Sequence, residues 1–254
     1  MLKNRLNGTF SWCLLCVVFI GCKKESFYNA LPFQTTEFSG RLKQPPGPPQ
    51  DELFFLVDYS GSMKTVDPLV NQSCKRFTLA VEILSKLMIE RRQLHVSLIG
   101  FSYSEDLLVG KLSLPVAINT FTSDYFCRYI EGTDYGLAFQ NAYLFLRESV
   151  KKKKVILMSD GLPDTRAQNK REGKDPDPDN KIARQKGLAS AEKIMALSQA
   201  EILVLFFNES LQGEIPIESM NYLTKITKKP SNVLSVFDSS FQNQLNQILN
   251  PFLR

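Results

Sequence analysis

The sequence has little of what nucleic-acid-binding proteins and many enzymes depend on. Its net charge is only +5 over 254 residues, too small a positive excess to predict a nucleic-acid surface. It contains a single histidine, His95, which lies inside an apolar run rather than beside a candidate serine nucleophile. No G-x-G-x-x-G loop follows the first apolar run, and the serine there does not lie in a G-x-S-x-G turn. These absences disfavour dinucleotide binding and hydrolase chemistry, and we do not expect an enzyme.

Long apolar runs are scarce too, and the one near the N-terminus is short. Lys3 and Arg5 precede the stretch WCLLCVVFIGC, which is too short for a comfortable membrane span and is typical of a signal peptide. Its end, FIGC, resembles the bacterial lipobox, in which the cysteine becomes the lipidated N-terminal residue. We therefore expect a lipoprotein signal peptide at 1–21 and a lipid anchor on Cys22. An ordinary signal peptide or an uncleaved anchor is the alternative.

Prolines gather in the segment that follows. QPPGPPQ, at 44–50, favours an extended polyproline II conformation because it can neither pair into a sheet nor continue a helix. We expect residues 22–50 to be a tether and residues 51–254 to be one domain. Lys23 stands where an aspartate would favour retention in the inner membrane, which indicates the outer membrane of a bacterial cell envelope.

The five cysteines divide according to this processing. Cys13 and Cys16 would leave with the signal peptide, and Cys22 would carry lipid. Cys74 and Cys127 remain, an even number in an oxidising compartment. They predict either one disulfide or two separate buried thiols.

From residue 51 onward, strand-like runs alternate with helical periodicity. The run at 53–57 is apolar throughout, as in strands that are buried on both faces. Lys75, Arg76 and other charged residues separate the apolar positions of the next segment and predict its polar face. We expect strands at 53–57, 94–101, 107–114 (at an edge), 154–160, 201–207 and 232–237, and helices at 77–88, 133–148, 182–199, 216–228 and up to about 250. This order predicts an α/β fold, a doubly wound, mostly parallel sheet flanked by helices.

Two further stretches give weaker predictions. The lysine run 151–154 indicates a solvated helix end. An aromatic group in the loops predicts either a contact surface or loops that pack on their own side chains: Tyr59, Tyr103, Tyr125, Phe126 and Tyr129.

Oxygen-bearing side chains follow two of the predicted strands. Asp58, Ser60 and Ser62 come directly after the first strand in DYSGS, and Asp160 follows the fourth in LMSDG. Thr133 precedes a helix in EGTDYG. Ligands in such sheets bind at the carboxyl ends of the strands, where the strand order reverses. The sequence therefore places these side chains where a site is expected.

The three stretches together resemble the von Willebrand factor A domain and its metal-ion-dependent adhesion site. The resemblance covers about 200 residues and implies a Rossmann-like fold that binds Mg²⁺ or Mn²⁺ through five side chains: Asp58, Ser60, Ser62, Thr133 and Asp160. Hydroxyl and carboxylate oxygens suit these hard cations, whereas zinc sites favour Cys and His. The alternative is that Asp58 and the serines only cap the next helix.

In this family the aspartates act largely through bound water, so the ion keeps a strong attraction for an acidic group from a partner protein. The resemblance thus implies an envelope lipoprotein whose domain binds a protein partner, through its Asp or Glu, at the metal. A scaffold or accessory subunit of a larger assembly, with a structural or regulatory metal, is the alternative.

Overall fold

A computed structural model describes residues 50–90, 93–174, 177, 179–208 and 214–249. The predicted signal peptide, Cys22 and nearly all of the tether lie outside these residues, as does the end of the last predicted helix. Within the described residues, none of the helices is long and apolar enough to cross a bilayer.

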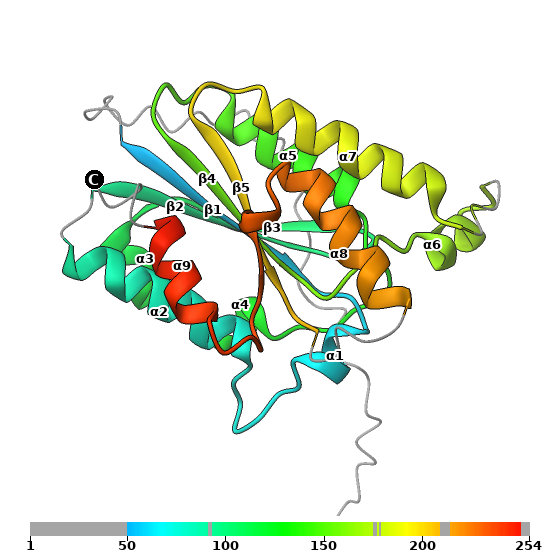
Figure 1. Cartoon of the computed structure of the whole chain (residues 1–254), viewed down its shortest axis with the longest axis horizontal. Helices are drawn as coiled ribbons and strands as arrows, with labels where there is room; N and C mark the ends of the chain where they lie inside the picture. The colour runs from blue at the N-terminus through cyan, green and yellow to red at the C-terminus, as the bar shows by residue number, and fades with distance from the viewer. Residues whose placement is uncertain (1–49, 91–92, 175–176, 178, 209–213, 250–254) are drawn as a thin grey trace, which may run out of the picture. The chain divides into compact units, whose positions relative to one another are not determined.

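A six-stranded sheet in the order β3-β2-β1-β4-β5-β6 forms the centre of the fold (Figure 1). β1 is hydrogen-bonded in parallel to both β2 and β4, and only β3, at an edge, runs antiparallel to its neighbour. The predicted doubly wound, mostly parallel sheet is therefore confirmed. The strands are β1 (Asp51–Asp58), β2 (Leu94–Phe101), β3 (Glu105–Ser113), β4 (Lys153–Ser159), β5 (Ala200–Phe206) and β6 (Val233–Ser235).

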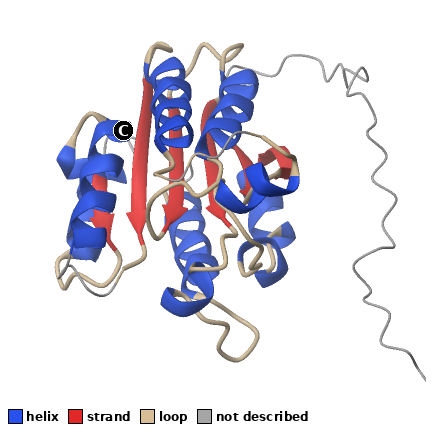
Figure 2. Ribbon diagram, turned by 90° about the vertical axis from the view of Figure 1, so that its right-hand side faces the viewer, coloured by secondary structure: helices blue, strands red, loops and turns tan. Residues whose placement is uncertain are grey.

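Helices cover both faces of the sheet (Figures 1 and 2). α2, α3 and α9 lie over one face, and α5, α7 and α8 lie over the other. The short helices α1, α3, α4 and α6 did not appear in the periodicity, because four to seven residues give too few turns for a pattern. The helices are α1 (Met63–Val66), α2 (Lys75–Ile89), α3 (Leu114–Thr120), α4 (Ser123–Phe126), α5 (Tyr135–Leu146), α6 (Arg166–Arg171), α7 (Lys181–Met195), α8 (Glu214–Thr227) and α9 (Phe241–Leu249).

The unbroken apolar run of β1 serves two cores at once. Leu53, Phe55 and Val57 pack on one side of the sheet, while Phe54 and Leu56 pack on the other. All five are at most 1% exposed. Alternate residues of a strand point to opposite faces, so a strand covered on both sides needs apolar residues throughout.

The lysine run leads into β4, and the prediction of a solvated helix end is wrong for Lys153 and Lys154, although Lys151 is exposed. Lys153 and Lys154 are each only 2% exposed. The Lys153 ammonium donates to two backbone carbonyl oxygens, those of Lys151 (2.8 Å) and Ser198 (3.0 Å). The Lys154 ammonium is paired with Glu201 at 3.0 Å. Such bonds make it feasible to bury long cationic side chains at this end of the sheet.

Glu52 lies at the same end of the sheet and predicts a pH dependence of stability. Burial raises the pKa of its carboxyl from 4.5 to about 7, although Lys111 and Lys153 oppose the rise. The folded state therefore holds this proton more tightly than the unfolded state, and the Glu52 contribution to stability falls as pH rises from 4.5 to 7.

Replacing Glu52 by glutamine should remove this loss. We expect E52Q to raise the free energy of unfolding by about 2 kcal/mol relative to the wild type at pH 8, and to leave it nearly unchanged at pH 4. Urea unfolding of both proteins at the two pH values measures the difference. An equal difference at both pH values would contradict the assignment.

Candidate metal centre

The strand order brings Asp58 and Asp160 to the same edge of the sheet. β1 and β4 are neighbours, and the chain proceeds from β1 towards β2 on one side and from β4 towards β5 on the other. The switch point therefore lies between β1 and β4. Asp58 is the last residue of β1, and Asp160 directly follows β4. His95, by contrast, lies near the start of β2, at the opposite end of the sheet.

The two carboxylates are close enough to affect each other's ionisation. Burial, followed by the nearby charge of Asp160, raises the pKa of Asp58 to about 7. Burial also raises the pKa of Asp160, although a hydrogen bond from the Ser62 hydroxyl opposes this rise. Two adjacent carboxylates removed from water are costly in free energy unless a positive charge accompanies them.

The loop after β1 directs its hydroxyl groups towards these carboxylates. The Ser60 amide donates to Asp58 Oδ1 at 2.8 Å, and the hydroxyl oxygens of Ser60 and Ser62 are 3.0 Å apart. Ser62 is the N-cap residue of α1, yet its side chain makes no capping hydrogen bond. The alternative that these side chains cap the next helix is therefore wrong for Ser62, whose hydroxyl lies against that of Ser60 instead.

A buried hydrogen-bond network fixes the Asp58 carboxylate from behind. The Ser159 hydroxyl donates to Asp58 Oδ2 at 2.6 Å. The Tyr135 hydroxyl has both the Ser159 oxygen and the Gly161 carbonyl, at 2.6 Å, within reach as acceptors for its single proton. Sequence reasoning missed Ser159 and Tyr135, because a serine in a strand and a tyrosine in a helix carry no signal of their own. They hold the Asp58 carboxylate in place, as outer partners hold the ligands of known metal sites.

Backbone hydrogen bonds hold Thr133 near the carboxyl ends of β1 and β4. Its amide donates to the Asp164 carbonyl at 2.8 Å, and its carbonyl accepts from the Asp164 amide at 2.9 Å. Three residues earlier, Ile130 forms a bridge with Ser60. Thr133 is therefore on a loop that is paired with the Ser60 loop on one side and with the chain beyond Asp160 on the other. Its hydroxyl remains a predicted ligand.

Burial decreases from the floor of the site to its rim. Asp58, Ser60 and Thr133 are at most 3% exposed. Ser62 is exposed, and Asp160 is half-buried. The site thus has a fixed inner side and an open outer side.

This donor set fits a hard divalent cation. Two carboxylates and neutral hydroxyl groups are oxygen ligands of the kind that Mg²⁺ and Mn²⁺ take. Zinc sites favour Cys and His ligands, and this set contains neither. The ion would be held by Asp58, Ser60, Ser62, Thr133 and Asp160, and when bound it would supply an electrophile for an external carboxylate.

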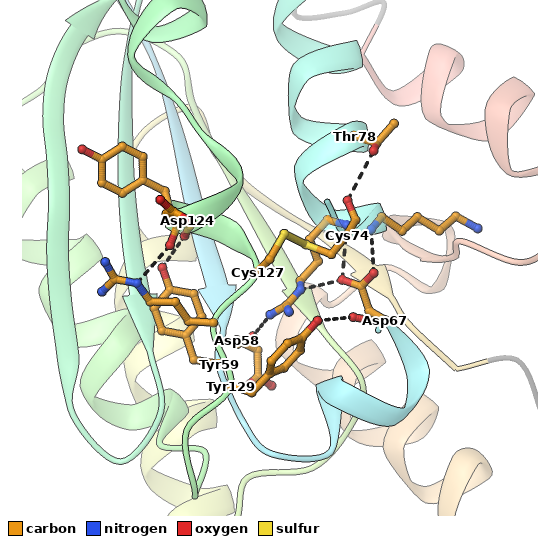
Figure 3. Close-up of a disulfide and its surroundings, with 12 residues drawn as sticks. Asp58, Tyr59, Asp67, Cys74, Thr78, Asp124, Cys127 and Tyr129 are labelled. Carbon is orange, nitrogen blue, oxygen red and sulfur yellow. Dashed lines mark hydrogen bonds and ion pairs between the residues drawn. A yellow bond between two sulfur atoms is a disulfide. The ribbon is translucent and has the colours of Figure 1, made fainter. Parts of the chain in front are cut away.

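A buried arginine joins the end of β1 to the segment after α1. Figure 3 shows Asp58, Asp67 and Tyr129, which surround it. Arg76 in α2 is fully buried; its Nε atom pairs with Asp67 Oδ2 at 2.6 Å, and its Nη1 atom donates to the Asp58 carbonyl oxygen. Tyr129 lies with its ring 5.2 Å from the guanidinium and donates its hydroxyl to the Asp67 carbonyl oxygen at 2.6 Å. The expectation that Arg76 lies on the polar face of its helix is therefore wrong, because this face meets the loops rather than water.

A disulfide between Cys74 and Cys127 lies beside this cluster (Figure 3). Their Cα atoms are 5.7 Å apart. The bond joins the N-cap of α2 to the residue after α4, which begins the loop that leads to Ile130 and Thr133. α2 and the Thr133 loop are thus covalently connected next to the candidate site.

The aromatic group of the loops packs largely inwards. Tyr59 is 1% exposed and Phe126 is fully buried, while Tyr103, Tyr125 and Tyr129 are half-buried. Tyr59 also donates its hydroxyl to the Tyr125 carbonyl. The interpretation as a contact surface is therefore wrong for Tyr59 and Phe126, which stabilise the loops instead.

Comparison with known proteins supports a von Willebrand factor type A domain. The model of that domain family matches residues 53–162, which run from β1 to just beyond Asp160. Among curated proteins, no relative matches the sequence.

Solved structures share the fold at low sequence identity. A point mutant of the PilB minor pilin from Streptococcus sanguinis has a TM-score of 0.60 at 15% identity, over 82% of this chain and 62% of the pilin. The vWF domain of the type V pili tip protein Mfa5 from Porphyromonas gingivalis has a TM-score of 0.56 at 12% identity, over 82% of this chain and 98% of that domain. The pilus adhesin SpaC from Lactobacillus rhamnosus GG has a TM-score of 0.52 at 17% identity, over 82% and 30% of the two chains. This chain thus spans less than two thirds of the pilin and of the adhesin, and the likeness shows the fold.

Proposed function

We propose that this protein is a binding module of the bacterial cell envelope, which grips a protein partner through a divalent cation at the β1–β4 switch point. The observation that supports the proposal is that the side chains of Asp58, Ser60, Ser62 and Asp160 lie close together, buried on one side and open on the other. Mg²⁺ or Mn²⁺ held there would attract an Asp or Glu carboxylate of the partner. The protein would act by binding rather than by catalysis, with its one histidine at the far end of the sheet.

The similarities to a minor pilin, a pilus tip protein and a pilus adhesin are in keeping with a protein-binding role outside the cytoplasm. A disulfide is also characteristic of proteins that leave the cytoplasm. We further propose that Cys22 carries a lipid anchor, in the outer membrane rather than the inner. The similarity to pilus subunits also favours a second candidate, an accessory subunit of an assembly in which the metal has a structural or regulatory role.

Metal binding to the folded domain predicts a gain of stability. At a free Mg²⁺ concentration of about 100 times its dissociation constant, the free energy of unfolding should rise by about 2.7 kcal/mol. For a domain of this size, the melting temperature should then rise by roughly 5–10 °C. Differential scanning calorimetry with Mg²⁺ and with EDTA measures the change.

Asp160→Ala should abolish this rise, because it removes a charged ligand at the open rim. Asp124→Ala is a matched control, since it removes an exposed carboxylate from the neighbouring helix α4. An equal response to Mg²⁺ in D160A and the wild type would refute the metal site. A partner complex that forms equally well in EDTA would favour the accessory-subunit candidate.

A further inference from the structure

A tight hairpin with exposed apolar side chains follows α1, the helix next to the candidate metal site. Val70 and Ser73 are hydrogen-bonded to each other in both directions, at 2.7 and 3.0 Å, across Asn71 and Gln72. Both turn residues have positive φ values, 51° and 63°, as in the tight turns that join twisted strands. Leu69 and Val70 are nevertheless 53% and 61% exposed.

Both ends of this hairpin are fixed. On its N-terminal side, the Asp67 carboxylate accepts from the Lys75 amide at 2.6 Å and pairs with Arg76. On its C-terminal side, Cys74 is in the disulfide. The exposed apolar side chains therefore lie on a hairpin that is already ordered. Binding a partner would cost little conformational entropy of this hairpin.

An open groove of about 360 Å³ lies beside the hairpin. Its walls come from the end of α1, the hairpin, the first turn of α2 and the segment after β6, and they include Val66, Pro68, Val70, Thr78 and Phe237. The groove is lined largely by apolar side chains, which suits it to a bulky apolar side chain of a partner.

The charge around the groove is suited to an acidic partner. The Asp67 carboxylate is buried and neutralised by Arg76. Lys75 holds its ammonium 4.1 Å from the Phe237 ring centroid, and Lys64 is exposed on α1. Neither lysine forms an ion pair within the described part of the chain. Asp238, next to Phe237 in the sequence, keeps its negative charge, because two hydrogen bonds from Ser240 lower the pKa of its carboxyl, so the two lysines outnumber it by one.

The groove and the candidate metal site are adjacent. Ser62 is the N-cap of α1 and Val66 ends the helix, and four residues of helix advance by about 6 Å. An extended peptide covers about 3.3 Å per residue. A partner segment would thus reach from the metal to the groove within two to four residues.

We infer that the groove beside residues 68–73 binds an apolar side chain of the same partner segment whose carboxylate meets the metal. The occupant is an extended peptide with an Asp or Glu and a bulky apolar residue two to four positions apart. This inference rests on the proposed function, and it adds the spacing of the recognised groups.

A peptide array tests the inference with a defined probe. Each peptide carries one Asp and one Leu in a Gly-Ser background, in both orders and one to seven positions apart. The full chain is applied with Mg²⁺ or with EDTA. We expect binding to peak at separations of two to four and to require Mg²⁺.

The double variant L69S/V70S should weaken the best peptide about tenfold, because it removes the apolar contact of the hairpin. Val150→Ser is the matched control, since Val150 is 73% exposed and lies on the loop before β4, at the opposite end of the sheet. Melting temperatures of both variants verify that they remain folded.

The outcomes separate the two claims. Mg²⁺-dependent binding that L69S/V70S leaves unchanged, or that is equal at all separations, overturns the groove inference and leaves the proposed function intact. Binding that L69S/V70S weakens but EDTA does not affect overturns the proposed metal-dependent function. No binding above the Gly-Ser control overturns the groove inference, and the Mg²⁺ response of stability then decides the metal site separately.

Discussion

Arg76→Met should lower the free energy of unfolding by about 3–5 kcal/mol, because it leaves the Asp67 carboxylate buried without its cationic partner. The side chains of Arg76 and Asp67 are 0% and 1% exposed, so water cannot replace the lost partner. The substitution also removes the hydrogen bond to the Asp58 carbonyl, and thereby loosens the strand end that carries the candidate metal ligand. Urea unfolding of the full chain at pH 7 measures the loss.

Replacing Asp67, the ion-pair partner of Arg76, provides the control for this prediction. The double variant D67N/R76M removes both charges and should be more stable than R76M alone, since no unpaired charge remains buried. Arg76→Lys should lie between the wild type and R76M, because an ammonium lacks the planar fork that bonds Asp67 and Asp58 at once. A change in R76M of less than about 0.5 kcal/mol, as is usual for surface substitutions, would show that the cluster does not stabilise the fold.

Loss of the disulfide is the second large effect that we expect. Cys74 and Cys127 are 53 residues apart, and closing a loop of that length in the unfolded chain corresponds to about 4 kcal/mol. C74S/C127S should therefore lower the free energy of unfolding by about 3–4 kcal/mol. Its affinity for Mg²⁺ should also fall several-fold, since Cys127 begins the loop that brings Ile130 against Ser60.

Reduction provides an independent test of the same bond. Dithiothreitol should lower the stability of the wild type to that of C74S/C127S, and it should not affect the variant. Either single variant, C74S or C127S, should lose as much as the double variant when it is kept reduced. A double variant as stable as the oxidised wild type would contradict the prediction.

The sequence was sufficient for the fold because its central strands are buried on both faces. The solid apolar run of β1 predicted a covered parallel strand, and the alternation of strands and helices predicted the doubly wound sheet. β3, at the edge, was predicted as well. Boundaries were less certain: the run 232–237 predicted a strand, but only Val233–Ser235 pairs with β5.

The buried residues that support the site could not be predicted from the sequence, because their environment depends on contacts between distant segments. Arg76 follows a helical polar pattern, and only the packing of the Asp67 and Tyr129 segments on it explains its burial. Lys153 and Lys154 were misjudged for the same reason, since their partners lie on other strands and loops. Asp58, Ser60, Ser62 and Asp160, by contrast, lie at or just after the ends of β1 and β4, where position along the chain predicts position in the sheet.

The position of β1 has a mechanical consequence. The chain enters the described domain at the start of β1, and the candidate metal site lies at the other end of the same strand, about 26 Å away. Tension between a bound partner and an anchored N-terminus would thus act along β1. Because β1 is hydrogen-bonded to β2 on one side and β4 on the other, this force would shear two ladders at once. Their bonds would have to break together rather than one after another, an arrangement that resists a pull on the anchor.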